Sequence, residues 1–469
     1  MHVCGQPMQQ FVCVSIPSMK NIGRQSAKPV FVFPFTFAYT SAIINQNHVG
    51  VNDLMKIGFE KRDITPPLGL ELGGYAGYRP NSGVHDPLWC KVILLEQEGV
   101  RYGLIVLDLM CADESLRDKI AAAVARQGIE KRHLIVSAIH SHAAPAGVIP
   151  GEGSLARVNE VIVPENLDFG VYMQTVVDAA AAACEEAIAA LEPFQVRTAR
   201  SEMPPVGSER HTGEKPEGML TAMEFRTRSG KNLIFYDFPC HPTVLSAANL
   251  QVSADFVGGI EALLDTDMAI FANGAAGDIS TRFTRRESTF EECARMSKIA
   301  AEQICSALQD KPFVEASSLR GKTIAVTLPV RQVGTVAEAT KQLEETTVRW
   351  QQAVADGADA GTVRILKSYV EGAGVNLEFA RSLSCIREFA VPVTVFRFAG
   401  LSFATVPGEF YSTLLPPDIT AICYANGYYR YIADKHAYDA GHYEALAAIV
   451  ARGSGEILSN TLRQLLEEI

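Results

Sequence analysis

The chain has 469 residues, of which 48% are apolar and 20% charged, and its 36 glycines and 23 prolines are spread along it rather than clustered. This composition excludes fibrous, coiled-coil and wholly disordered proteins and predicts a globular α/β enzyme. The 53 acidic and 42 basic side chains give a net charge of −11. Because no dense cluster of lysine and arginine interrupts the acidity, nucleic acid is not an expected partner.

The cysteines and residues 1–54 bear on the cellular compartment in which the protein is expected. Ten cysteines are scattered without a C-x-x-C pair, which is typical of reduced, mostly buried thiols in a cytoplasmic protein. No apolar run reaches the roughly 18 residues of a membrane span, so no transmembrane segment is expected. Residues 1–54 lack periodicity and are interpreted as a disordered or mis-started extension or a weak targeting segment. A start at Met55 leaves 469 − 54 = 415 residues, whereas a signal peptide at 19–42 would make the protein secreted.

Short β-rich runs alternate with helical ones from Met55 onward. Strands are expected at 102–108, 133–138, 195–200, 220–226, 233–238, 268–272, 391–398 and 401–406, and helices at 113–127, 166–191, 254–264, 290–308 and 457–466. This alternation favours parallel βαβ units. We therefore expect an α/β fold with mixed or largely parallel sheets flanked by helices, ligands at strand carboxyl ends, and a single large domain over 55–469. A polar helical pattern near 335–380 predicts an inserted lid, cap or peripheral element.

Two predicted strands are followed by histidines. His140 and His142 follow the apolar run 134–139, and residues two apart in an extended chain point to the same side, so both imidazoles can face one cavity. His241 follows 233–238 and lies between two prolines, which fix it rigidly. Each pattern taken alone is also common in ordinary loops and turns. Cys240 is an alternative ligand, although its apolar neighbours favour a buried thiol.

Three further segments carry polar groups after predicted strands. The small residues between Asn273 and Ser280 let the backbone approach a substrate, and Asp278 and Ser280 alternate so that both can face a pocket. A tight turn capped by Asp278 explains the same residues equally well. Glu409 follows a Pro-Gly turn, and tyrosines gather over 428–443. Two histidines and one glutamate at strand carboxyl ends, completed by oxygen ligands or water, form a hydrolytic zinc set.

Seven blocks, in this order, resemble the catalytic, N-terminal domain of the neutral/alkaline non-lysosomal ceramidase family. They are Asp63-Ile-Thr-Pro-Pro-Leu-Gly69, Gly83-Val-His-Asp-Pro-Leu88, Ser137-Ala-Ile-His-Ser-His142, Phe238-Pro-Cys-His-Pro242, Asn273-Gly-Ala-Ala-Gly-Asp-Ile-Ser280, Pro407-Gly-Glu-Phe410 and the tyrosines of 428–443. The resemblance covers about residues 56–450. It implies a zinc-dependent amidase of sphingolipid and lipid metabolism with one zinc per chain, held by His140, His241, Glu409 and Tyr431.

The resemblance also implies a reaction centre, made of His142, Arg210, Ser280 and Tyr443. In that interpretation a zinc-bound hydroxide attacks the amide carbonyl, and His142 or Tyr443 passes a proton or donates to the developing oxyanion. Asp278 would orient the loop or the histidines. A covalent mechanism with Ser280 as nucleophile is the rival, and it needs an adjacent base.

Two departures from the family concern the substrate. The family's H-T-H-S-G-P reads His140-Ser-His-Ala-Ala-Pro145 here, and the sequence ends soon after the tyrosines, where ceramidases of the family continue into an immunoglobulin-like domain. We therefore expect a small soluble amide or N-acyl compound as substrate. An esterase or lactonase on the same scaffold and a non-catalytic metal-binding protein are the alternatives. The oligomeric state stays open.

Overall fold

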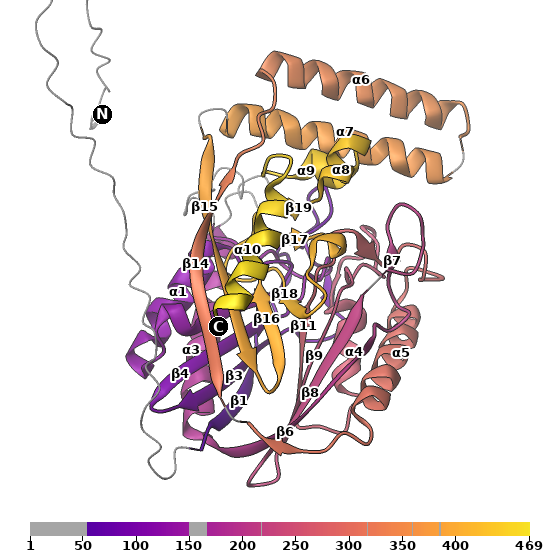
Figure 1. Ribbon diagram of the computed structural model, residues 1–469. Helices are drawn as coiled ribbons and strands as arrows, with labels where there is room; N and C mark the ends of the chain where they lie inside the picture. The colour runs from indigo at the N-terminus through magenta and orange to yellow at the C-terminus, as the bar shows by residue number, and fades with distance from the viewer. Residues whose placement is uncertain (1–53, 150–166, 217, 317, 359, 384–385) are drawn as a thin grey trace, which may run out of the picture. The chain divides into compact units, whose positions relative to one another are not determined.

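The computed structural model describes residues 54–149, 167–216, 218–316, 318–358, 360–383 and 386–469. Figure 1 shows how the helices and strands of these residues are arranged. The segment interpreted as an extension lies, apart from its last residue, outside the described residues. The account below therefore concerns the chain from Leu54 onward.

A nine-stranded mixed sheet forms the larger part of the core. Its strands, in spatial order, are β11 (Met268–Asn273), β9 (Asn232–Phe238), β8 (Met219–Thr227), β6 (Glu192–Glu202), β1 (Lys56–Asp63), β3 (Trp89–Gln97), β4 (Val100–Leu107) and β5 (Leu134–Ala138), with β13 (Val314–Glu315) paired to β6. Of the pairings in this sheet that the structure describes, only β4 with β5 and β9 with β11 are parallel. The expected fold of mixed or largely parallel sheets flanked by helices is confirmed in its mixed form, and most pairings of the large sheet are antiparallel.

Tight hairpins explain the antiparallel pairings. Glu98 and Gly99 join β3 to β4 with φ values of 53° and 76°, and Gly230 lies between β8 and β9 with a φ of 94°. The two-residue connection between β3 and β4 and the four-residue connection at 228–231 between β8 and β9 return the chain beside the strand it has just left, so in both cases the next strand runs antiparallel. These Glu-Gly and Ser-Gly pairs were a sequence signal for hairpins that the helix-strand alternation obscured.

Helices cover the large sheet and begin at polar caps. The helix α3 (Leu167–Ala189) packs on β1 and β3 and also contacts α1 (Glu114–Val124), while α5 (Phe290–Leu308) packs on α4 (Asp255–Glu261), β6 and β8. Asp113 caps α1 by accepting a hydrogen bond from the Leu116 backbone, and Thr289 caps α5 in the same way from Glu292. Such caps satisfy amides that have no partner within the helix.

The carboxyl-terminal part of the chain adds a second sheet and a helical pair. The four strands of the sheet are β14 (Leu319–Pro329), β15 (Glu388–Phe398), β16 (Leu401–Thr405) and β18 (Ile419–Ile422), and α10 (Ser454–Glu468) packs against β14 and β15. The helices α6 (Val336–Ala355) and α7 (Ala360–Ser382) pack on each other, and α7 contacts α9 (Tyr443–Ala447), as seen at the top of Figure 1. Among the described residues, no helix combines the length and apolarity needed to cross a bilayer.

Short strands and turns link distant parts of the chain around the strand ends. Three two-stranded pairs join β2 (Gly83–Val84) to β10 (Gln251–Val252), β7 (Ser208–Glu209) to β12 (Ile279–Ser280), and β17 (Glu409–Phe410) to β19 (Tyr431–Ile432). The remaining short helices are η1 (Ala125–Gln127), η2 (Lys131–His133), η3 (Ser412–Leu414) and α8 (Lys435–Ala440). The last two short-strand pairs carry residues of the candidate site.

Candidate functional site

Three strand ends meet at the buried side chain of Asn273, the last residue of β11. Its Nδ2 donates to the carbonyl oxygens of Ile139 at 3.0 Å and Cys240 at 3.1 Å. Ile139 follows β5 and Cys240 follows β9, so one amide group holds the two histidine segments side by side. His140 comes next and has a φ of 71°. A residue other than glycine is strained at positive φ, and such strain is commonly found where a functional side chain must point in a particular direction.

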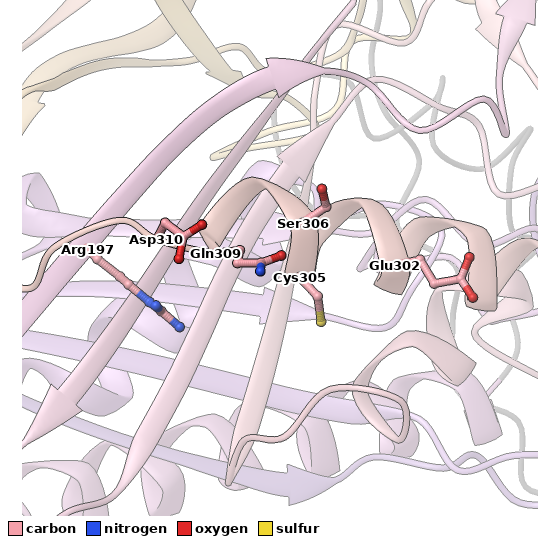
Figure 2. A pocket seen from close by; sticks show the side chains of 6 residues that line it. All are labelled: Arg197, Glu302, Cys305, Ser306, Gln309 and Asp310. Atoms are coloured by element: carbon pink, nitrogen blue, oxygen red, sulfur yellow. The ribbon is translucent and has the colours of Figure 1, made fainter.

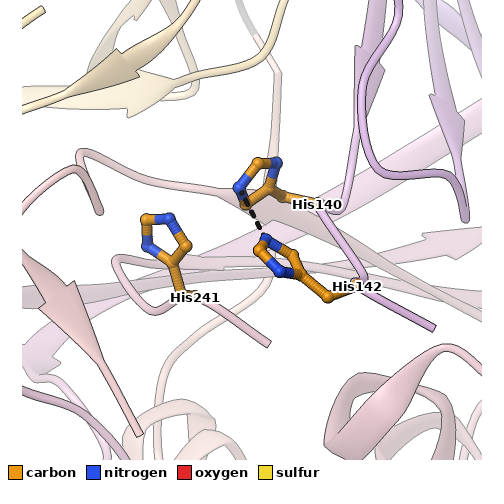
Figure 3. A group of neighbouring side chains, drawn as sticks. All are labelled: His140, His142 and His241. Carbon is orange, nitrogen blue, oxygen red and sulfur yellow. Dashed lines mark hydrogen bonds between the residues drawn. The ribbon is translucent and has the colours of Figure 1, made fainter. Parts of the chain in front are cut away.

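Three imidazoles and one carboxylate, here called the inner cluster, converge beyond this junction. Figure 3 shows the three imidazoles, His140, His142 and His241, whose ligand atoms all lie within 4.8 Å of one another. His140 Nε2 lies 3.3 Å from His142 Nε2, and Glu409 Oε2 lies 2.8 Å from His241 Nε2 and 3.6 Å from His140 Nε2. His140, His241 and Glu409 are at most 3% exposed. The structure therefore brings the three residues His140, His241 and Glu409 together, and their role as metal ligands stays a prediction.

The other ring nitrogens determine what these imidazoles can bind. His140 Nδ1 lies 2.7 Å from the Met110 carbonyl oxygen, and His241 Nδ1 lies 2.7 Å from that of Ala276. A carbonyl only accepts, so each Nδ1 carries the proton and each Nε2 presents a lone pair. The two Nε2 lone pairs therefore face the Glu409 carboxylate, which is also an acceptor. A cation between them satisfies all three groups, and two imidazoles with one carboxylate are ligands that zinc prefers.

Burial and neighbouring charges favour the neutral form of two imidazoles of the inner cluster, His142 and His241. Burial and then the nearby Arg210 lower the pKa of His241 to about 4, and burial together with the other two histidines lowers the pKa of His142 well below its ordinary value. A metal ion binds an imidazole in its neutral form and a carboxylate in its ionised form.

A tyrosine and an arginine lie beside the inner cluster. In the β17–β19 pair Tyr431 is the register partner of Glu409, and the Tyr431 ring lies 6.4 Å from that of His241. Arg210 Nη1 donates to the Tyr431 hydroxyl at 3.0 Å, and the Tyr443 ring lies 5.9 Å from the Tyr431 ring. The structure therefore gathers Arg210, Tyr431 and Tyr443 near the histidines, as the sequence predicts. Their chemical roles stay predictions.

Ser280 and Asp278 are near the inner cluster but make different contacts. Ser280 forms a backbone bridge with His241, and its hydroxyl accepts from the Arg282 backbone at 3.4 Å. Among the hydrogen bonds of the described residues, none joins an imidazole to the Ser280 hydroxyl. Asp278 accepts from the Ser412 backbone at 2.8 Å and the Ser412 hydroxyl at 2.6 Å, and burial raises its pKa to about 6.

The contacts of Asp278 bear on its two predicted roles. Its carboxylate binds Ser412, which begins η3 after β17, as expected of a residue that orients a loop. Among the hydrogen bonds of the described residues, none joins this carboxylate to a histidine, so the predicted role in orienting the histidines has no contact to support it. The histidine Nδ1 atoms are held by backbone carbonyls instead, and these carbonyls come from strand-end turns whose geometry the side-chain pattern does not reveal.

Two features of the site escaped the sequence reasoning. Gly74 has a φ of 85°, and a Cβ atom built there lies 2.4 Å from the His142 ring, while the neighbouring Tyr75 ring meets the same imidazole edge-on at 4.8 Å. Tyr428 lies among the tyrosines of 428–443 but was given no role in the predicted site, and its hydroxyl donates to Glu409 Oε1 at 2.6 Å. The double glycine before Tyr75 was the available signal for a close backbone approach.

A surface hollow of about 540 Å³ lies along the end of α5 (Figure 2). It is lined by Arg197, Glu302, Cys305, Ser306, Gln309 and Asp310. None of the predicted site residues lines this hollow. Cys305 is also the exposed member of the seven unpaired cysteines that the structure describes, the others being buried.

The mixed α/β fold brings a buried histidine-carboxylate cluster to its strand ends, and three imidazoles of this cluster lie close enough together to hold a metal ion. Residues 55–310 match the sequence profile described as neutral/alkaline non-lysosomal ceramidase, N-terminal. The chain belongs to this family and is a ceramidase-like hydrolase, which confirms the resemblance.

Two solved structures of ceramidases share the fold of this chain. A crystal structure of neutral ceramidase from Pseudomonas aeruginosa superposes with a TM-score of 0.66 at 16% identity, covering 88% of this chain and 74% of that one. A structure described as a ceramidase complexed with C2 gives a TM-score of 0.64 at 15% identity, covering 88% and 75%. At these identities the likeness shows a shared fold. The search among curated proteins gave no match.

Proposed function

We propose that this chain is a zinc-dependent hydrolase that cleaves the amide bond of an N-acyl substrate. The observation that carries the proposal is the convergence of His140 Nε2 and His241 Nε2 on the Glu409 carboxylate, with both Nδ1 protons held by backbone carbonyls. Such a set of acceptors in a buried site calls for a cation. Membership of the ceramidase family supports the amide bond as the target.

His140, His241, Glu409 and Tyr431 are the proposed ligands of one zinc ion. Bound zinc lowers the pKa of water toward neutrality and polarises a carbonyl oxygen. His142 is assigned to proton transfer, because its Nε2 lies beside the Nε2 of His140 and its low pKa keeps the imidazole neutral and able to accept a proton. Arg210 and Tyr443 are assigned to the developing oxyanion, which a buried cation and a hydroxyl donor stabilise.

The contacts around Ser280 favour this mechanism over a covalent one. The described residues give Ser280 a backbone amide rather than an imidazole as hydrogen-bond partner, and a serine nucleophile needs an adjacent base. His241, whose backbone bridges to Ser280, has its ring nitrogens directed at carbonyls and at Glu409. Ser280 is therefore proposed as a lining residue of the substrate pocket.

A substrate panel tests the proposal. Zinc-loaded protein is assayed against N-acyl amides of graded acyl length, ceramide, and esters and lactones of matched acyl length, before and after complete chelation. Amide cleavage that chelation abolishes and zinc restores is the expected result. Stoichiometric zinc without turnover of any substrate would identify a binding protein, and cleavage of esters or lactones alone would identify the alternative hydrolase.

A further inference from the structure

Arg210 reaches the candidate site from a loop and is held there by a buried carboxylate. Its Nη1 donates to the Tyr431 hydroxyl at 3.0 Å and to the Gly277 carbonyl at 3.3 Å, and lies 3.2 Å from Glu444 Oε1. The side chains of Arg210 and Glu444 are 11% and 2% exposed. Among the ion pairs of the described residues, Glu444 is the carboxylate partner of Arg210.

Glu444 lies in α9, directly after Tyr443, and its second oxygen is also engaged. Glu444 Oε2 lies 3.0 Å from His211 Nε2, and the His211 ring stacks on the His442 ring with centroids 3.7 Å apart. We call His211, His442 and Glu444 the outer cluster. Through it, one carboxylate ties the loop after β7, which carries Arg210, to the short helix that carries Tyr443.

We propose that Glu444 is a positioning residue that holds the Arg210 guanidinium against Tyr431 and fixes the spacing between Arg210 and Tyr443. This inference rests on the proposed function, because Arg210 and Tyr443 are the groups assigned there to the oxyanion. The physical reason is that a buried guanidinium without its carboxylate partner is poorly compensated and moves to find other acceptors. A displacement of about 1 Å at a reaction centre lowers the rate by about 100-fold.

The first test replaces Glu444 while keeping its shape. Glu444→Gln retains the volume and one acceptor oxygen but removes the charge. Glu302→Gln, at an exposed position of α5, is the matched control. The expected result is a 10- to 100-fold lower kcat, roughly, with KM changed by less than about threefold and zinc content unchanged. Glu444→Asp is expected to recover part of the loss. A kcat within about twofold of the parent, or a fall matched by the control, overturns the proposal.

A second test separates positioning from a merely structural role. In the Arg210→Met background, where the guanidinium is gone, Glu444→Gln is expected to change kcat by less than about twofold. Equal losses of kcat in both backgrounds overturn the proposal. A second equivalent of bound zinc that is lost in His442→Ala also overturns it, because Glu444 would then bind a metal in the outer cluster.

A crystal structure of Glu444→Gln gives a readout that does not depend on activity. The distance between Arg210 Nη1 and the Tyr431 hydroxyl is expected to exceed hydrogen-bond range. An unchanged contact overturns the proposal even if amide hydrolysis is found. Absence of turnover in the parent protein counts against the proposed function instead, and the crystallographic distance then still decides the role of Glu444.

Discussion

The inner and outer histidine clusters, both formed by residues that the structure describes, differ in what holds their rings. In the inner cluster the Nδ1 atoms of His140 and His241 face backbone carbonyls, so their Nε2 atoms are left as ligands. In the outer cluster His211 and His442 stack face to face, and His211 Nε2 is paired with Glu444. His211 is also 27% exposed, whereas His241 is fully buried.

The comparison shows that histidine proximity alone does not make a metal centre. Backbone anchors set the tautomer and aim the lone pair, and burial keeps the imidazole neutral. In the outer cluster the hydrogen bond to Glu444 raises the pKa of His211, although burial opposes it, which favours a protonated ring. The inner cluster is therefore suited to hold a cation, and the outer cluster is suited to hold side chains in place.

The largest expected effect comes from replacing an inner-cluster ligand. His241→Ala is expected to lose bound zinc and to lower kcat/KM by about 1,000-fold or more, because a cation site that loses an aimed imidazole binds weakly. His442→Ala, the matched change in the outer cluster, is expected to keep its zinc. Elemental analysis of both purified variants checks the contrast, and equal zinc content in the two would abolish the distinction between the clusters.

The second-largest effect is expected from replacing Asn273, which holds together the strand ends that carry the histidines of the inner cluster. Asn273→Ala leaves the carbonyls of Ile139 and Cys240 buried without their donor, which costs about 3 kcal/mol in the free energy of unfolding. Urea unfolding monitored by fluorescence measures this loss. Asn232→Ala, at the solvent-accessible start of β9, is the control. A loss below about 1 kcal/mol would show that Asn273 does not hold the strand ends together.

A smaller effect is expected where the backbone approaches His142. Gly74→Ala places a Cβ against the imidazole, so we expect zinc to be retained while kcat falls about tenfold. Gly69→Ala is a matched control, because Gly69 has the same φ of 85° but nothing within 4 Å of the added Cβ. Steady-state kinetics with zinc analysis compares the two. Similar kcat values for both variants would remove His142 from the proton-transfer role.

The smallest effect is expected at Ser280. Ser280→Ala is predicted to lower kcat by less than about tenfold, because the hydroxyl has no imidazole partner among the described residues. Ser306→Ala, at the end of α5, is the control. Loss of nearly all activity together with retained zinc would favour the covalent mechanism.

Much of the site could be predicted because its residues follow strands. His140, His142 and His241 come directly after apolar runs, and Glu409 follows a Pro-Gly turn, so residue type and position along the chain were informative. The long helices could also be predicted from the sequence, and α5 spans the predicted residues 290–308.

What could not be predicted depends on contacts between distant segments. The predominance of antiparallel pairs within the mixed sheet could not be predicted, because the hairpins at Glu98 and Gly230 are short signals within a longer alternating pattern. Glu444 carries no local motif, and its pairing with Arg210 arises only when α9 meets the loop after β7. The partner of Asp278 is likewise set by the turn after β17.

Zinc K-edge X-ray absorption spectroscopy of the zinc-loaded protein tests the central claim most directly. The account predicts only nitrogen and oxygen ligands at about 2.0–2.2 Å, with scattering from two imidazoles. Cys240 is buried beside His241, and its thiol contacts the backbone carbonyls of Val206 and His241 rather than an imidazole nitrogen or the Glu409 carboxylate. A sulfur ligand at about 2.3 Å, or a shell without imidazole, would contradict a metal centre built from His140, His241 and Glu409.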